Sequence, residues 1–130
     1  MIRRFLPMTI VMIIIFLLSN TPGKDLPSAI NGLDKLLHAI AYGTLAASCL
    51  YGLHPAARDK GSLLTGMAVI FFCFFYGLTD EFHQSFIPGR SPSGLDIAAD
   101  TSGAALTVLL WHWWRTRRRF SGRGKTMGLG

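Results

Sequence analysis

The chain has 130 residues, of which half are hydrophobic and 15% are charged, and its formal net charge is +6. Its mean hydropathy is +0.37. These values disfavour an ordinary soluble domain, and they are typical of a small integral membrane protein.

Four apolar stretches along the chain are long enough to be considered as membrane spans. A helix crosses the hydrocarbon core with about 20 mostly apolar residues, and the lower limit is near 17. We therefore predict an all-α integral membrane bundle over residues 1–114, with spans at about 4–19, 33–53, 62–79 and 95–114. The first stretch is short and follows Arg3 and Arg4, as in a signal peptide. We favour an uncleaved span, because the residues after Ser19 lack a small-x-small cleavage pattern.

Lys and Arg are unevenly divided between the two ends of these spans. Four spans place both termini on one side, and the opposite side would hold only Lys24, Lys35 and Arg90 of the 13 basic residues. The positive-inside rule therefore predicts cytoplasmic termini and a multi-pass protein of the cytoplasmic membrane. We expect residues 115–130 to form a disordered, basic cytoplasmic tail that is attracted to anionic lipid and does not bind nucleic acid.

Polar residues at helical spacing mark the outer end of the second span. Asp34, His38 and Tyr42 are four residues apart, so they form one stripe on one face of a helix. Lys35 lies beside this stripe. Ionisable residues at membrane depth are costly, which makes the stripe a candidate functional site.

The third span ends in a similar stripe. Tyr76, Asp80 and Gln84 are again four residues apart, and His83 shares their side. Glu81 is turned about 100° away, so it faces another helix or the headgroups.

The fourth span begins with two more carboxylates, Asp96 and Asp100, which are also four residues apart. Pro88-Gly89 ahead of it is a turn signal, which places Arg90 above the site. A guanidinium there suits bidentate contact with phosphate or carboxylate. Three helices are therefore predicted to direct carboxylates, imidazoles and a phenol toward one point near the outer leaflet.

Candidate roles for these residues follow from their chemistry. The candidates for acid–base catalysis are His38, Asp80 and His83. The candidates for substrate contact are Lys35, Tyr42, Glu81, Gln84, Arg90 and Ser91. A divalent cation site is the alternative use of Asp80, His83, Asp96 and Asp100, where oxygen-rich ligands favour Mg or Mn over Zn.

Structural roles compete with the functional ones for several of these residues. They include helix capping, close helix packing through small residues, interhelical hydrogen bonds and an interhelical ion pair. The corresponding residues are Asp34 as an N-cap, Ser93 with Asp96 as a capping box, Gly103 as a packing residue, Tyr42 with Tyr76, and Lys35 with Asp80.

Taken in order, these motifs resemble the VanZ-like family of small multi-span membrane proteins. The resemblance runs from about Asp34 to Gly103, and the order of several motifs makes it specific. The family takes its name from a protein linked to low-level teicoplanin resistance, so the resemblance implies a role in the cell envelope. Asp100 departs from the family, which more often has Asn at this position. The motifs are Asp34-Lys35-x-x-His38-x-x-x-Tyr42, Gly77-x-x-Asp80-Glu81-x-His83-Gln84, Pro88-Gly89-Arg90-Ser91 and Asp96-x-x-Ala99-Asp100-Thr101-x-Gly103.

The sequence leaves three classes of function open. The first is an enzyme that acts on an anionic lipid headgroup or a lipid-linked cell-envelope intermediate. The chain has no HExxH or GxSxG motif, so the reaction is not specified. The second is a non-catalytic protein that binds a membrane lipid or a lipid-linked cell-wall precursor. The third, ranked last, is a proton-coupled transporter, which would need an oligomer because one short chain without an inverted repeat offers little room for a pathway.

Overall fold

The computed structural model describes residues 2–23, 32–59 and 62–123, and helices are the only regular secondary structure in this part of the chain. A 3-10 turn, η1 (Ile2–Phe5), leads into α1 (Leu6–Ser19). The other helices are α2 (Leu33–Asp59), α3 (Ser62–Gln84) and α4 (Gly94–Arg123). Each helix follows one of the predicted apolar stretches, and the predicted all-α class is confirmed.

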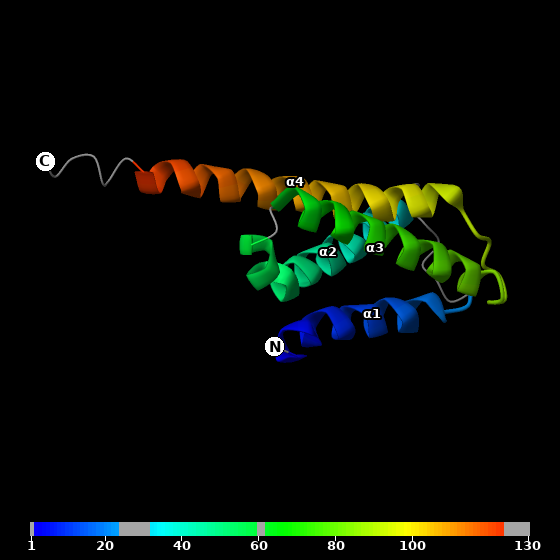
Figure 1. Ribbon diagram of the computed structural model, residues 1–130. Helices are drawn as coiled ribbons and strands as arrows, with labels where there is room; N and C mark the ends of the chain where they lie inside the picture. The colour runs from blue at the N-terminus through cyan, green and yellow to red at the C-terminus, as the bar shows by residue number, and fades with distance from the viewer. Residues whose placement is uncertain (1, 24–31, 60–61, 124–130) are drawn as a thin grey trace, which may run out of the picture.

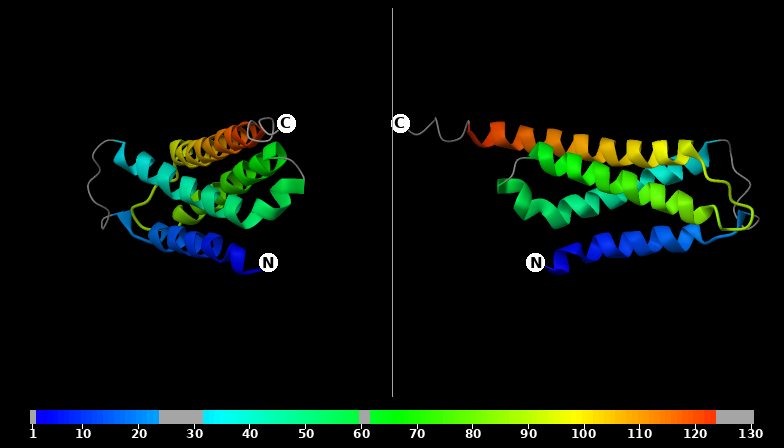
Figure 2. Two further views of the ribbon diagram at one scale, coloured as in Figure 1. Left: turned by 90° about the vertical axis from the view of Figure 1, so that its left-hand side faces the viewer. Right: turned by 45° about the vertical axis from the view of Figure 1, so that its right-hand side comes forward.

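The four helices run alternately up and down as an antiparallel bundle (Figures 1 and 2). The start of α1 and the end of α4 lie at one end of the bundle. At the opposite end of the bundle, the C-terminal ends of α1 and α3 lie near the N-terminal ends of α2 and α4. The polar motifs lie at these helix ends in the sequence, so the topology alone gathers them at one end of the bundle.

The closest packing in the bundle is between α2 and α4. At their crossing, a Cβ added to Gly103 would collide with the backbone carbonyl of Ala39. A Cβ added to Gly43 would lie 3.1 Å from the hydroxyl of Thr107. The small residues let the two backbones approach, as small-xxx-small spacing does in membrane helices. This contact brings the polar faces of α2 and α4 together.

The surface of the bundle is apolar, whereas several polar side chains are buried. On α3, Phe71, Phe75 and Phe82 are each more than half exposed, but Asp80 and Glu81 are 6% and 3% exposed. A soluble helical bundle has the opposite arrangement. Two stretches, 33–54 in α2 and 63–84 in α3, are long and apolar enough to cross a membrane by length and composition.

Helix α4 continues well beyond the predicted end of the last span and projects past the other helices (Figure 1). The predicted disorder from residue 115 is therefore wrong for residues 115–123, and residues 124–130 lie outside the described part of the chain. Cation–π contacts at four-residue spacing help to stabilise the continued helix, because a helix places such residues next to each other on one face. The pairs are Arg115 over Trp111 at 5.0 Å, Arg117 over Trp113 at 4.2 Å and Arg118 over Trp114 at 3.9 Å.

Candidate functional site

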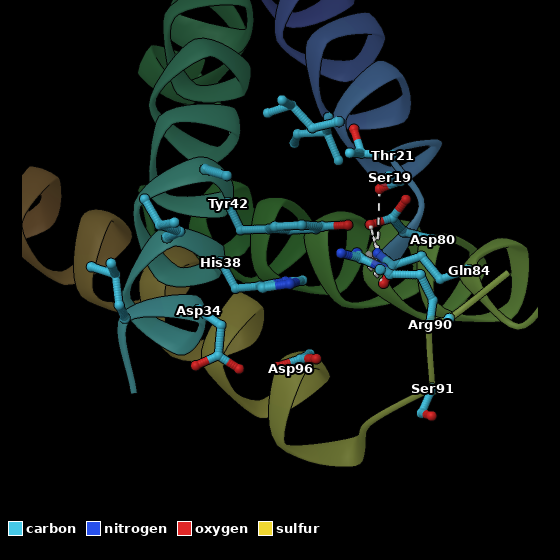
Figure 3. Close-up of a pocket in the computed structure, with 17 residues that line it drawn as sticks. Ser19, Thr21, Asp34, His38, Tyr42, Asp80, Gln84, Arg90, Ser91 and Asp96 are labelled. Atoms are coloured by element: carbon cyan, nitrogen blue, oxygen red, sulfur yellow. Dashed lines mark hydrogen bonds between the residues drawn. The ribbon is translucent and has the colours of Figure 1, made fainter. Parts of the chain in front are cut away.

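A cavity of about 540 Å³ lies at the polar end of the bundle. All four helices and the loop between α3 and α4 contribute to its wall (Figure 3). One part of the wall is apolar and comes from α1 and α2: Ile15, Leu18, Leu33, Leu37 and Ala41. The polar lining comes from every element: Ser19, Thr21, Asp34, His38, Tyr42, Asp80, Gln84, Arg90, Ser91 and Asp96.

The stripe predicted on α2 lines this cavity along its whole length. His38 and Tyr42 point from α2 toward Asp80 and Gln84 of α3, and Asp34 lies on the cavity wall below His38 (Figure 3). Tyr42 is 1% exposed, and its hydroxyl has no hydrogen-bond partner among the described residues. The hydroxyl therefore remains available to a group that enters the cavity.

Within this stripe, His38 forms a hydrogen bond with a buried carboxylate of α4. The Nδ1 atom of His38 lies 2.9 Å from Oδ1 of Asp100, whose side chain is 1% exposed. Gly77 makes room for this carboxylate, because a Cβ at that position would lie 3.0 Å from Oδ2 of Asp100. A carboxylate in this position fixes the orientation of the imidazole ring through Nδ1. The other ring nitrogen, Nε2, is not used in this hydrogen bond.

Arg90 reaches the cavity from a tight turn between α3 and α4. The amide of Arg90 donates to the carbonyl of Ile87 at 3.1 Å, and Gly89 has a φ of 76°. Proline at the second position and a glycine with positive φ at the third are the features of a type II turn. The turn is tied to the segment that follows α1, since the amide of Gly23 donates to the carbonyl of Pro88 at 3.1 Å. The predicted turn at Pro88-Gly89 is confirmed.

A chain of hydrogen bonds runs from Arg90 along the wall formed by α3. The guanidinium donates to Oε1 of Gln84. The amide nitrogen of Gln84 donates to Asp80 at 3.0 Å and to Ser19 at 3.3 Å. Gln84 and Asp80 are both buried, so this chain holds them in fixed positions beside the cavity.

Glu81 is buried and points toward α2 and α4. Its Oε2 accepts the backbone N–H of Ser93 at 2.7 Å, at the start of α4. The predicted capping box is therefore wrong in one respect: Glu81 of α3, and not Asp96, accepts the backbone N–H of Ser93. One ligand atom each from His38, Glu81 and Asp96 lies within 4.8 Å of the others. In the described part of the chain, these three residues could hold a metal ion.

His83 lies away from the cavity and packs against α1. Its Nε2 atom is 3.2 Å from Oδ1 of Asn20, and its ring centroid is 5.0 Å from that of Phe16. The predicted metal set of Asp80, His83, Asp96 and Asp100 is therefore not brought together, because His83 points to the α1 side of α3.

Three further structural expectations are corrected. Lys35 forms ion pairs with Asp34, at 2.8 Å, and with Asp96, and not with Asp80. Asp34 lies inside the first turn of α2, which begins at Leu33, so it is not the N-cap. Tyr76 does form an interhelical hydrogen bond, but its hydroxyl donates to the carbonyl of Met12 at 2.9 Å and not to Tyr42.

No site residue was predicted at the end of the first apolar stretch, although Ser19 and Thr21 line the cavity. Asn20 between them supports His83. The available signal was the change from an apolar run to Ser19-Asn20-Thr21 at the end of the first stretch. This change resembles the polar helix ends of the other three stretches.

A family model described as VanZ/LLP1 matches residues 4–115, which include every residue that lines the cavity. Neither the curated proteins nor the solved structures gave a match to the chain. The family match and the two apolar helices together indicate a membrane protein. Because the match extends over most of the chain, the protein belongs to the VanZ/LLP1 family.

Proposed function

We propose that the protein spans the cytoplasmic membrane four times, with both termini in the cytoplasm and the cavity at the extracytoplasmic face. The shared position of the start of α1 and the end of α4 supports an even number of spans (Figure 1). The basic residues of α4, including Arg115, Arg117 and Arg118, lie at the end opposite the cavity. That distribution favours a cytoplasmic position for this end.

In this orientation the cavity binds the anionic headgroup of a membrane lipid or of a lipid-linked cell-envelope intermediate. The observation that carries the proposal is the environment of Arg90. Its guanidinium lies on the cavity wall and donates to a neutral amide, that of Gln84. None of the salt bridges among the described residues involves Arg90. A guanidinium that has no carboxylate partner among these residues is suited to bidentate binding of a phosphate or carboxylate.

The rest of the cavity is consistent with a lipid ligand. The apolar wall, with Ile15, Leu18 and Leu37, suits the part of a lipid next to its headgroup. The unpartnered hydroxyl of Tyr42 can donate to an anionic oxygen. Exposed apolar side chains cover the bundle, so lipid would surround it. If the protein bound a lipid-linked cell-wall precursor in this way, it would change the access of large glycopeptides such as teicoplanin to the envelope.

The second candidate is catalysis on the same headgroup, and the His38–Asp100 hydrogen bond favours it. A buried carboxylate on Nδ1 is the arrangement that prepares Nε2 of an imidazole to accept a proton. No Ser, Thr or Cys side chain of the described residues shares a hydrogen bond with His38. A proton acceptor at this position would therefore act on a water molecule or on a substrate hydroxyl.

Lipid binding by the purified protein tests the first candidate. Native mass spectrometry in detergent would measure the affinity for phosphatidylglycerol and, as a neutral reference, phosphatidylcholine. We expect a preference for phosphatidylglycerol that falls about tenfold or more in Arg90→Gln, since a hydrogen bond to a charged group contributes about 1.5–3 kcal/mol. The matched control, Arg117→Gln, removes the same charge at the opposite end. An equal loss in both variants would contradict a specific site at Arg90.

A further inference from the structure

Three ligand atoms from three helices meet beside the cavity. His38 comes from α2, Glu81 from α3 and Asp96 from α4, and the ligand atoms lie within 4.8 Å of one another. Ligands on opposite sides of an ion with bonds of about 2.0–2.2 Å are about 4 Å apart. Small side-chain movements would therefore bring all three atoms to bonding distance of one ion.

A buried oxygen without a partner points to a ligand at this position. Glu81 is 3% exposed, and its Oε1 atom has no hydrogen-bond partner among the described residues. Its other oxygen is fixed by the backbone N–H of Ser93 at 2.7 Å. Leaving a buried carboxylate oxygen unsatisfied is costly, and metal coordination is one of the ways in which proteins satisfy such atoms. This observation separates the group from an ordinary cluster of acidic residues.

The hydrogen bonding of His38 is compatible with a role as a metal ligand. Its Nδ1 is bound to Asp100 at 2.9 Å, which leaves Nε2 for coordination. Metal-bound histidines commonly make such a hydrogen bond to a carboxylate through the nitrogen that does not bind the ion. The buried position of Asp100, with 1% of its surface exposed, suits this supporting role.

The charges around the three residues also favour a cation. Glu81, Asp96 and Asp100 lie close to His38, and among the described residues the ammonium group of Lys35 pairs with Asp96 and Asp34. Lys35 interacts with Oδ1 of Asp96, so the second oxygen of this carboxylate remains for an ion. Buried carboxylates in excess over cations are expensive unless they are paired or bound to a metal.

We propose that His38, Glu81 and Asp96 bind one divalent metal ion, with Asp100 holding the His38 ring. One imidazole and two carboxylates favour Mn²⁺ or Zn²⁺ over Mg²⁺ and Ca²⁺, which prefer ligand sets made of oxygen alone. The site goes beyond headgroup binding, because Arg90 and Gln84 take no part in it. Metal binding and the general-base role of His38 are mutually exclusive alternatives, since an imidazole that coordinates through Nε2 and binds Asp100 through Nδ1 has no nitrogen left for proton transfer.

Metal binding to the full-length protein in detergent, purified without a histidine tag, tests the proposal. Electron paramagnetic resonance would measure bound Mn²⁺, and calorimetry would measure Zn²⁺. We expect one ion per chain, and at least a tenfold loss of affinity in Glu81→Gln and in His38→Gln. His83→Gln is the matched control, because it removes an imidazole outside the group. This control should bind the ion like the unaltered protein.

A second measurement is independent of whether the variants fold. In the Mn²⁺-loaded unaltered protein, electron spin echo modulation should detect one coordinated imidazole nitrogen. Absence of this nitrogen signal overturns the proposal, as does the failure of both Mn²⁺ and Zn²⁺ to bind at millimolar concentration. Loss of binding in His83→Gln with retention in Glu81→Gln would place the ion elsewhere and also overturn it. Lipid binding at Arg90 is measured without added metal, so the two proposals fail separately.

Discussion

The Nδ1 atom of His38 lies 2.9 Å from Oδ1 of Asp100, and this hydrogen bond joins the polar faces of α2 and α4. It lies on the cavity side of the crossing at which Gly103 packs against Ala39. The close backbone approach brings the two side chains within reach, so the packing residue and the polar pair form one structural unit. Substitutions of His38 or Asp100 can therefore be compared with substitutions of Gly103, to distinguish the effect of the polar pair from the effect of helix packing.

Asp100→Asn should fold and keep most of its stability. The amide has the size of the carboxylate and can accept a hydrogen bond from His38 through its oxygen. Asp100→Ala removes the partner of a partly buried imidazole, and we expect a loss of about 1–3 kcal/mol in the free energy of unfolding. Thermal unfolding in detergent would measure both variants. Equal destabilisation by Asn and Ala would show that the charge of Asp100, and not its hydrogen bond, is needed for folding.

Gly103→Ala should destabilise the bundle by about 1–3 kcal/mol, because the new Cβ collides with the Ala39 carbonyl and forces α2 and α4 apart. Gly94 provides a matched control in the same helix, since a Cβ added there meets nothing within 4 Å. Gly94→Ala should be neutral or stabilising by up to about 1 kcal/mol, given the higher helix propensity of alanine. The same unfolding measurement compares the two, and equal effects would contradict the close crossing.

His38→Gln and His83→Gln should differ in function. Both variants can keep a hydrogen bond, but His38 lines the cavity whereas His83 binds Asn20 on the α1 side. We expect His38→Gln to abolish any effect of the expressed protein on teicoplanin susceptibility and His83→Gln to preserve it. Immunoblots of membrane fractions would confirm equal expression. Preservation of the effect in His38→Gln would remove this residue from the functional site.

Helical spacing predicted a large part of the site because the residues concerned share one helix. Asp34, His38 and Tyr42 line the cavity together, as their four-residue spacing requires. The spacing could not predict which neighbour each side chain of α3 would meet. Relative to Asp80, Glu81 is turned by about 100° in one direction and His83 by about 60° in the other. Glu81 therefore faces α4 and His83 faces α1, and only tertiary packing decides which helix lies on which side.

The end of α4 illustrates a second limit. Residues from Arg115 onward are basic and include few apolar side chains, so the sequence predicted a disordered segment. The helix nevertheless continues to Arg123, with Arg117 over Trp113 at 4.2 Å. Composition describes what a segment cannot bury, but it does not describe contacts within one helix.

The orientation of the bundle is tested by labelling single cysteines with a membrane-impermeant maleimide in whole cells. Cys49 and Cys73 are 2% and 0% exposed, and a variant with alanine at both positions provides a background without thiols. In that background, Ser91→Cys should react in intact cells, because Ser91 is exposed at the cavity end of the bundle. Arg117→Cys is exposed at the other end and should react only after permeabilisation.

Leu109→Cys is the control for the membrane itself. Its side chain is 64% exposed on α4, between the two ends, so a soluble bundle would leave it reactive toward the maleimide. A lipid-embedded thiol stays protonated and out of reach of a charged reagent, and we expect no labelling before or after permeabilisation. Reaction at Arg117→Cys but not at Ser91→Cys in intact cells would invert the orientation and move the cavity to the cytoplasmic face. Reaction at Leu109→Cys would contradict the membrane position of α4, and with it the supply of lipid to the cavity beside Arg90.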